Sequence, residues 1–504
     1  METHNFFKKV VQKSLGKRMH IYFSDYFNID KKIMENYGVF NISLINDLPV
    51  FIDPFLLFTS DKDEYKKLHD NIIKYITFLK DISQDGELKK GILKHLFLFP
   101  EVKQNWLGYS KTGNKGAGLG ITFATALNES FQTIFTNFGA EEISQSSHLE
   151  KLCLIKSDVG RDNISDFTTN LIKGFLCEYT QEFAKKYIDE QFLKNVYVVH
   201  SEFNYHTRTW ISKEYKLPYI DNDFVLLSPK DLLTKDDTWI NKNDLYGDFS
   251  SIRSSIPNDE LRDQVNDYFL RTLPKEPKQK DLDLSINMTI RKYPELIDYY
   301  IKYKEDTGDK AIEISDFKIK ETENIFIEKI YNFITKLENQ NDFSKTTWDT
   351  FDETYQRVNF LKQVIENNDG YKIFYIKGQP LKREADIQLM FRLTWFATSS
   401  DVNSEVNNGR GPVDYKISRG FKDKTLVEFK LASNSKLKQN LAKQVEVYQE
   451  ANQTKKAIKV ILYFDESELV KTKRILKELD LKEGKSIILI DASNNKPSAS
   501  NVLL

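Results

Sequence analysis

The fold is decided by residues 409–430, which read GRGPVDYKISRGFKDKTLVEFK. The Gly- and Pro-containing start predicts a turn, followed by a short strand that contains Asp414. A hairpin then leads to a second, apolar strand that contains Glu428 and Lys430. Successive residues of a strand point to opposite faces of the sheet. We therefore expect Glu428 and Lys430 to share one face, while the apolar residues between them face a core.

Two carboxylates and a lysine brought together in this way suit the chemistry of a divalent-metal phosphodiesterase. Carboxylate oxygens are hard ligands that hold Mg²⁺ beside substrate phosphates. The metal lowers the pKa of bound water and neutralises phosphate charge, and a lysine can position that water. The simpler interpretation is an exposed hairpin, because an E-x-K triplet is common in a chain that is 29% charged. The combination of turn, Asp strand and E-x-K within an apolar strand favours the metal site.

These residues resemble the PD-(D/E)XK nuclease superfamily, which has the restriction-endonuclease-like fold. The resemblance implies that Asp414, Glu428 and Lys430 are catalytic and that Asp414 and Glu428 bind metal. It implies Mg²⁺ as the cofactor, with Mn²⁺ as a substitute. The Pro-Asp of the family stands here as Pro412-Val413-Asp414, with one residue inserted. The Pro mainly shapes the turn, so the Asp keeps its chemical role.

A second motif follows the strands. Gln444 and Tyr448 lie four apart on a helix predicted from about Ser435 to Ala451, and therefore on one helix face. This Q-x-x-x-Y spacing resembles the exonuclease-like branch of the superfamily. It implies that both residues are catalytic and orient the metal site or contact the nucleic-acid backbone. The alternative is a polar stripe on an amphipathic helix.

The family often takes a further metal-binding glutamate from the helix before the Asp strand. Glu384, on a helix predicted from Leu381 to Thr398, fits that topology. Glu405, in a predicted loop, is nearer to Asp414 in the sequence. Both remain candidates at this stage.

The charge distribution favours a polyanionic partner for the C-terminal part. Residues 371–504 contain 24 Lys and Arg against 16 Asp and Glu, whereas the preceding 370 residues contain 49 against 58. A basic module on an acidic body is typical of contact with nucleic acid, although scattered solvated lysines give the same count. We expect DNA rather than RNA as the partner. The candidate contact residues are Arg410, Lys436, Lys438 and Lys443.

Composition limits the remaining possibilities. The chain of 504 residues has 40% hydrophobic residues and 13% aromatic residues, enough for several cores. Two cysteines give neither a disulfide framework nor zinc-ligand spacing. No signal peptide and no membrane-length apolar run stands out. We expect a cytoplasmic protein without membrane contact, with a homo-oligomeric or regulatory partner left open.

Periodicity predicts a multidomain α/β protein. Residues 1–225 are expected to form a mostly helical α+β domain, and residues 226–370 a charged linker and helical region. Residues 371–504 are expected to form the restriction-endonuclease-like domain, with a central mixed sheet flanked by helices. Their order begins with a strand at 371–376 and continues helix, strand, strand, helix, strand, helix, strand.

Taken together, the sequence predicts a Mg²⁺-dependent nuclease that hydrolyses phosphodiester bonds. By analogy with bacterial restriction and anti-phage defence endonucleases, the N-terminal region would act as sensor or regulator. Two alternatives stay open. One is a non-catalytic nucleic-acid-binding protein with a nuclease-like core. The other is a nucleotide-sensing switch built on the Gly-rich stretch Gly113 to Gly120.

Overall fold

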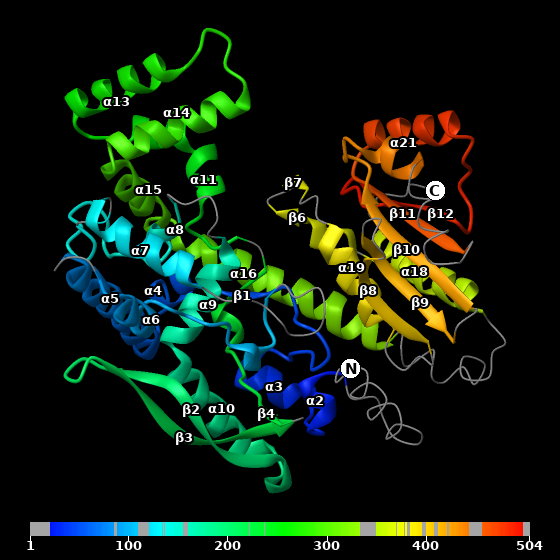
Figure 1. Ribbon diagram of the computed structural model, residues 1–504, viewed down its shortest axis with the longest axis horizontal. Helices are drawn as coiled ribbons and strands as arrows, with labels where there is room; N and C mark the ends of the chain where they lie inside the picture. Colours follow the sequence, from blue (N-terminus) through cyan, green and yellow to red (C-terminus); the bar gives the residue numbers. More distant parts are fainter. Residues whose placement is uncertain are drawn as a thin grey trace, which may run out of the picture. The chain divides into compact units, whose positions relative to one another are not determined.

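The computed structural model describes most of the chain as a mixed α/β protein (Figure 1). The described residues are 21–84, 88–108, 120–133, 135, 137–154, 160–220, 222–235, 237–332, 349–368, 370–376, 379–380, 384–395, 400–407, 412–420, 423–442 and 456–496. The chain divides into two compact units. The C-terminal unit comprises residues 320–504 with a short segment that ends at Asp25, and the N-terminal unit comprises most of residues 26–319.

The C-terminal unit is built on a five-stranded sheet in the order β12-β11-β10-β9-β8. Its strands are β8 (Asp401–Asn407), β9 (Pro412–Arg419), β10 (Asp423–Leu431), β11 (Ala457–Tyr463) and β12 (Ile487–Asp491). β10, β11 and β12 run parallel, whereas β9 and β8 are antiparallel to their neighbours. The sheet is therefore mixed, as expected from the sequence.

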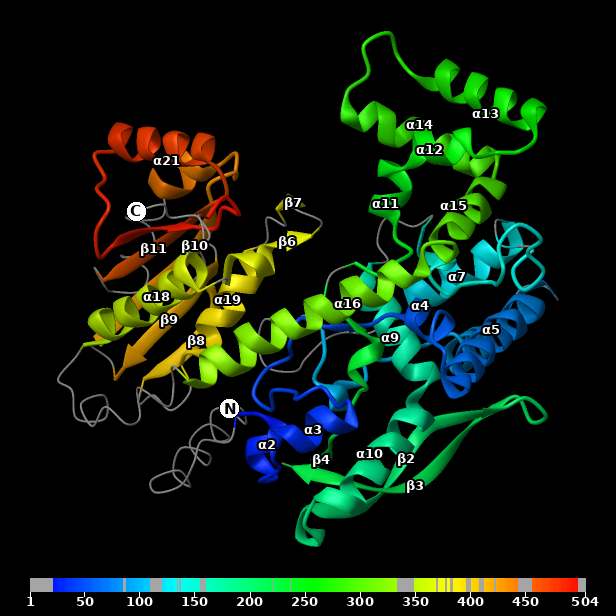
Figure 2. The ribbon, with the colours of Figure 1, turned by 180° about the vertical axis from the view of Figure 1, so that it is seen from behind.

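Helices cover the sheet on both faces. α18 (Thr350–Asn367) contacts β9 to β12, and α19 (Glu384–Leu393) contacts β10. Seen from behind, α18 lies in front of the strands (Figure 2). On the other face, α21 (Glu466–Glu478) contacts β11, and a helical segment over residues 437–442 follows β10.

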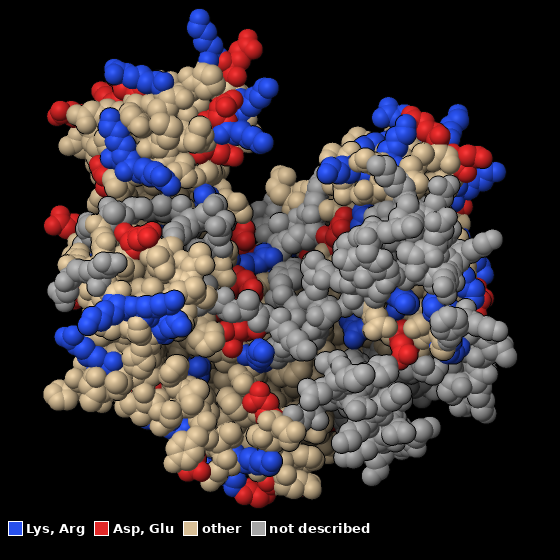
Figure 3. Space-filling view, viewed as in Figure 1, with Lys and Arg blue, Asp and Glu red and all other residues tan. Residues whose placement is uncertain are grey.

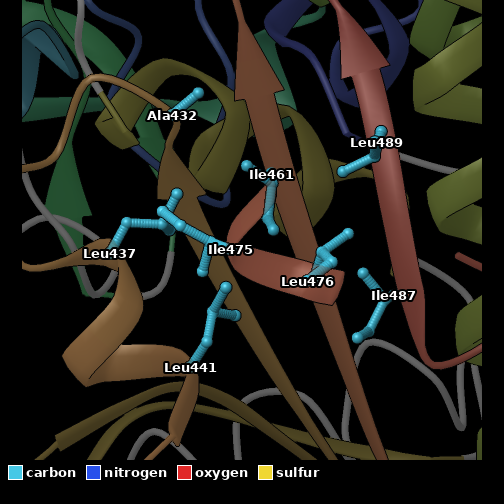
Figure 4. Packing of buried hydrophobic residues seen from close by; sticks show 8 residues of the cluster. All are labelled: Ala432, Leu437, Leu441, Ile461, Ile475, Leu476, Ile487 and Leu489. Atoms are coloured by element: carbon cyan, nitrogen blue, oxygen red, sulfur yellow. The ribbon is translucent and has the colours of Figure 1, made fainter. Parts of the chain in front are cut away.

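In each strand, odd-numbered and even-numbered residues point to opposite faces of the sheet. Leu437 and Leu441 of the segment 437–442 pack with Ile475 and Leu476 of α21 and with odd-numbered strand residues such as Ile461 (Figure 4). The opposite face carries Phe429 of β10, whose ring lies 5.2 Å from that of Phe391 of α19. Both faces are thus apolar over most of their area, as expected for strands buried between two layers of helices.

Two local expectations for this unit were wrong. Residues 371–374 belong to the 3-10 helix η5 (Gly370–Phe374), and only β6 (Tyr375–Ile376) is a strand, paired with β7 (Gln379–Pro380) outside the main sheet. Glu405 lies on β8 and not in a loop. β8 is an edge strand, which tolerates polar residues that hide its strand character in the sequence.

α18 also shows that the compact unit starts earlier in the sequence than the boundary expected at Gly370. Its buried residues include Val358, Leu361 and Ile365. Lys456 ties the start of α18 to β10, since its Nζ lies 2.8 Å from Asp349 Oδ2 and 2.8 Å from Asp423 Oδ1. The helix is therefore an integral layer of the sheet unit.

The N-terminal unit is mainly helical, with one long hairpin. β2 (Leu193–Asn204) and β3 (Thr209–Ile220) pair antiparallel, and β3 also pairs with β4 (Asp223–Phe224). A separate short pair joins β1 (Phe51–Ile52) to β5 (Leu233–Thr234). The helices are α3 (Lys31–Tyr37), α4 (Pro54–Phe58), α5 (Asp63–Gln84), α6 (Lys90–Leu96), α7 (Ile121–Thr133), α8 (Lys151–Leu154), α9 (Arg161–Leu171), α10 (Lys173–Tyr187), α11 (Lys242–Gly247), α12 (Phe249–Ser254), α13 (Asp259–Thr272), α14 (Gln279–Lys292), α15 (Glu295–Glu305) and α16 (Gly308–Thr322).

The charged stretch expected as a linker is folded into α11 to α14. Val265 and Phe269 of α13 are buried, so the helix has an apolar face despite its many charges. Cations also cover aromatic rings there: the Arg253 guanidinium lies 4.4 Å from the ring centre of Phe269, and Lys292 Nζ lies 4.1 Å from that of Tyr268. Such contacts let charged helices bury aromatic surface. No helix among the described residues is long and apolar enough to cross a bilayer.

Candidate active site

The candidate site lies on the α21 side of the sheet, where the β9–β10 ladder ends. The last antiparallel pair is Val427 with Tyr415. Beyond this point the strands separate, and the next backbone N–H groups of β10 that face β9 have no backbone partner there. Asp414 Oδ2 accepts the Phe429 N–H at 2.6 Å, and Glu384 Oε1 accepts the Leu431 N–H at 3.2 Å. Two carboxylates thus accept N–H groups of β10 beyond the last pair with β9, and these hydrogen bonds hold the carboxylates in place.

The strand alternation places Glu428 and Lys430 on the face that the sequence predicted. Phe429 between them points to the opposite face, where its ring contacts Phe391 and lies 6.3 Å from that of Tyr415. The Tyr415 hydroxyl donates to the Gln388 carbonyl at 2.8 Å, which fixes α19 against β9. Because α19 is held in this way, its first residue, Glu384, reaches the end of β10.

Four oxygen atoms surround the Lys430 ammonium. Its Nζ lies 3.3 Å from Glu428 Oε1, 3.7 Å from Glu384 Oε2 and 3.9 Å from Asp414 Oδ2. It also donates to the Phe429 carbonyl at 2.9 Å. The side chains keep 14% exposure at Lys430, 28% at Glu384, 19% at Asp414 and 9% at Glu428. The cluster is therefore mostly buried and keeps limited contact with solvent.

The charges of the cluster act on one another. Burial raises the pKa of Glu428, and the Lys430 ammonium opposes this in part. Burial likewise raises the pKa of Glu384, against the effects of Lys430 and the Leu431 N–H. Burial lowers the pKa of Lys430, but the three carboxylates outweigh it and the net shift is upward. In this arrangement Lys430 is a cation at neutral pH.

Carboxylate oxygens are the type of donor that a hard divalent cation prefers. Mg²⁺ is usually held by one or two carboxylates plus waters and substrate phosphates, and not by an all-protein cage. Here three carboxylates and a backbone carbonyl already converge on one positive charge, the Lys430 ammonium. Within the described ranges, no three His, Cys, Asp or Glu side chains are drawn together as a ready metal cage. Asp414, Glu428 and Glu384 are the residues that would hold the cation.

The other predicted site residues are distributed as follows. Lys436 immediately precedes the segment 437–442 and Lys438 lies within it, where Lys438 pairs with Glu478 of α21 at 2.8 Å. The backbone pairs Ser404–Tyr415 and Val406–Val413 place Glu405 beside Asp414 in the β8–β9 register. Outside the described residues lie Arg410, Lys443, Gln444 and Tyr448, and also residues 109–119 of the Gly-rich stretch.

Sequence reasoning missed Lys459, which lies opposite Glu428 in the parallel register of β10 and β11. It is 7% exposed, and its Nζ donates to the Leu441 carbonyl at 3.1 Å. Burial lowers its pKa, and Glu428 opposes this. The available signal was a lysine in the middle of an otherwise apolar strand, Ala457-Ile458-Lys459-Val460-Ile461. Such a lysine needs a reason to be buried.

The chain matches two protein families. Residues 28–241 match a family described as Domain of unknown function (DUF8370), and residues 350–466 match one described as Domain of unknown function (DUF8371). The second match begins at α18 and contains β8 to β11 with the whole carboxylate–lysine cluster. No curated protein and no solved structure matches the chain.

Proposed function

We propose that the C-terminal unit is a Mg²⁺-dependent nuclease that hydrolyses phosphodiester bonds of nucleic acid, with DNA favoured over RNA. The observation that carries the proposal is the convergence of Asp414, Glu428 and Glu384 on the Lys430 ammonium. The resemblance to the PD-(D/E)XK superfamily supports it independently, because it rests on the order and spacing of the motif. Mn²⁺ is the natural substitute metal.

Each residue has a role that follows from its position. Asp414 and Glu384 are fixed by the backbone N–H groups of Phe429 and Leu431, so both carboxylates are oriented before any ligand arrives. Glu428 supplies the most enclosed carboxylate. A bound divalent cation would lower the pKa of a water ligand and neutralise charge on the phosphate. Lys430 holds a positive charge where negative charge develops in the transition state.

The substrate surface is less sharply defined than the cluster. On the side shown in Figure 3, basic and acidic side chains are interspersed around α21. Lys438, one candidate phosphate contact, forms an ion pair with Glu478. We therefore assign sequence-independent phosphate contacts to this surface, and no base specificity.

The cellular role belongs to the same proposal. A nuclease unit joined to a larger N-terminal unit is the arrangement of restriction and anti-phage defence proteins, so the N-terminal unit would recognise the target or restrain cleavage. This role rests on analogy with such proteins.

The deciding experiment compares wild-type protein with Asp414→Asn on plasmid, linear DNA and total RNA, in Mg²⁺, Mn²⁺ or EDTA. We expect cleavage by the wild type in Mg²⁺ or Mn²⁺, none in EDTA, and none by the variant. Circular dichroism should show that the variant is folded. Equal cleavage by the two proteins, or cleavage that persists in EDTA, would contradict the proposal. Metal-independent binding without cleavage would instead favour a non-catalytic nucleic-acid-binding protein.

A further inference from the structure

Lys459 lies beside the carboxylate cluster, on the neighbouring strand β11, and among the described residues it forms no ion pair with the cluster. It stands opposite Glu428 in the sheet, on the same face, and is 7% exposed. Among the described residues its ammonium makes no ion pair within 4.0 Å, and its one hydrogen bond goes to the Leu441 carbonyl. The surroundings are apolar: Leu441 and Ile461 belong to one buried cluster (Figure 4).

Burying an ammonium group costs desolvation free energy unless its charge interacts favourably with other groups. Methionine or leucine would fill the same place in a strand without the desolvation cost. In a poorly solvated interior, a fixed charge acts over several ångströms with little screening. The nearest acidic group across the strand is Glu428. The charge of Lys459 therefore acts on the cluster.

The formal charges indicate the direction of this effect. Asp414, Glu428 and Glu384 carry three negative charges, and Lys430 offsets one. Lys459 offsets a second from the neighbouring strand β11, and among the described residues it does so without an ion pair to any of the three carboxylates. A cation that enters the cluster therefore meets less negative charge than the carboxylates alone would offer.

We propose that Lys459 is a positioning residue that weakens divalent-cation binding at the Asp414–Glu428–Glu384 cluster, so that the cation can exchange. This inference rests on the proposed function of the same site. The cluster should therefore bind divalent cations more weakly than it would without the buried positive charge of Lys459.

A purely structural role for Lys459 makes a different prediction, and the chain offers a matched control. Lys471 of α21 donates to the Ala432 carbonyl at 2.9 Å and to the Asn434 carbonyl at 3.4 Å. It thus ties down the same segment after β10 that Lys459 ties down at Leu441. Loss of either lysine should cost stability, but only loss of Lys459 should change cation affinity.

The test is calorimetric titration of metal-free, full-length protein with MnCl₂ and MgCl₂, together with thermal melting. Lys459→Met should bind Mn²⁺ about tenfold more tightly than wild type, because one opposing charge is gone. Lys459→Arg, which keeps the charge, should stay within about twofold of wild type. Lys471→Met should melt at a lower temperature with unchanged affinity. Lys459→Gln, neutral but still a hydrogen-bond donor, replaces the Met variant if that variant does not fold.

The outcomes separate the two proposals. Wild-type protein that binds and cleaves, with neutral Lys459 variants of equal or weaker cation affinity, would overturn the role of Lys459 alone. Wild-type protein that binds neither cation would overturn the metal site and this inference with it. Tighter binding by Lys471→Met would show that loosening the segment, and not the charge, controls affinity.

Discussion

Two charge clusters, one in each unit, are buried in different ways. In the N-terminal unit, Lys151 pairs directly with Glu141 at 3.0 Å and with Asp298 at 2.5 Å, and these side chains are 2–6% exposed. In the C-terminal unit, Lys430 meets its three carboxylates at 3.3–3.9 Å, and the side chains keep 9–28% exposure. One cluster is closed and the other is open.

The difference distinguishes charged residues that stabilise the fold from charged residues that could take part in catalysis. A closed cluster is complete in itself, because its ions have replaced water with one another and have no room for a ligand. The open cluster keeps longer separations and partly exposed side chains, and two of its carboxylates, Asp414 and Glu384, are fixed by backbone N–H groups. We therefore expect substitutions in the closed cluster to change stability and substitutions in the open cluster to change activity.

Among the lysine substitutions, the largest effect on cleavage is expected at Lys430. Lys430→Met removes the positive charge at the centre of the open cluster, and we expect initial cleavage rates to fall by at least about 100-fold. The three carboxylates would then repel one another, so added Mg²⁺ should raise the melting temperature of the variant more than that of wild type. Cleavage at the wild-type rate would show that the open cluster is not the active site.

The closed cluster should respond in the opposite way. Lys151→Met leaves Glu141 and Asp298 buried without their cation, so the free energy of unfolding should fall by about 3–5 kcal/mol. Chemical denaturation of the full chain measures this loss. Where the variant is still folded, cleavage should be close to wild type. A stable variant with lost cleavage would reverse the assignment of the two clusters.

A third prediction concerns pH and the N-terminal unit. Burial, with Glu101, Asp162 and Asp166 nearby, raises the pKa of Asp47 to about 9. Folded Asp47 is therefore protonated at neutral pH, whereas in the unfolded chain it ionises above about pH 4. Its stabilising contribution is complete below that pH and is lost as the pH rises toward 9.

Asparagine cannot ionise, so Asp47→Asn should not lose stability in this way as the pH rises. At pH 8.5 we expect the variant to melt several degrees above wild type, with the gap closing toward pH 4. Melting curves between pH 4 and 9 measure the effect, with Asp223→Asn as an exposed control. Parallel pH profiles of wild type and Asp47→Asn would refute the buried, protonated state.

How far the sequence reaches can be judged residue by residue. Local alternation was enough to place Glu428 and Lys430 on one face, and helix periodicity was enough to place Glu384 on the helix before the Asp414 strand. β8 was missed because an edge strand needs few apolar residues. Lys459 was missed because its place opposite Glu428 depends on the register of two parallel strands joined by a long crossover, which no local pattern contains.

The smallest effect is expected at Lys438. Its ion pair with Glu478 is exposed, with side-chain exposures of 58% and 43%, so Lys438→Met should change stability by less than about 1 kcal/mol. If Lys438 contacts phosphate, its loss should lower nucleic-acid affinity severalfold. The slope of log affinity against log salt concentration should also decrease in magnitude by about one. An unchanged salt slope would remove Lys438 from the interface.

The assignment of the open cluster as a Mg²⁺-dependent active site is tested most directly by single-turnover cleavage. Wild type and Glu428→Gln are compared in matched Mg²⁺ and EDTA buffers, with thermal melting of both proteins. Glutamine keeps the size of the side chain and removes its charge. We predict Mg²⁺-dependent cleavage by the wild type, none by Glu428→Gln, and melting temperatures within a few degrees of each other. Cleavage by Glu428→Gln at the wild-type rate would contradict this assignment.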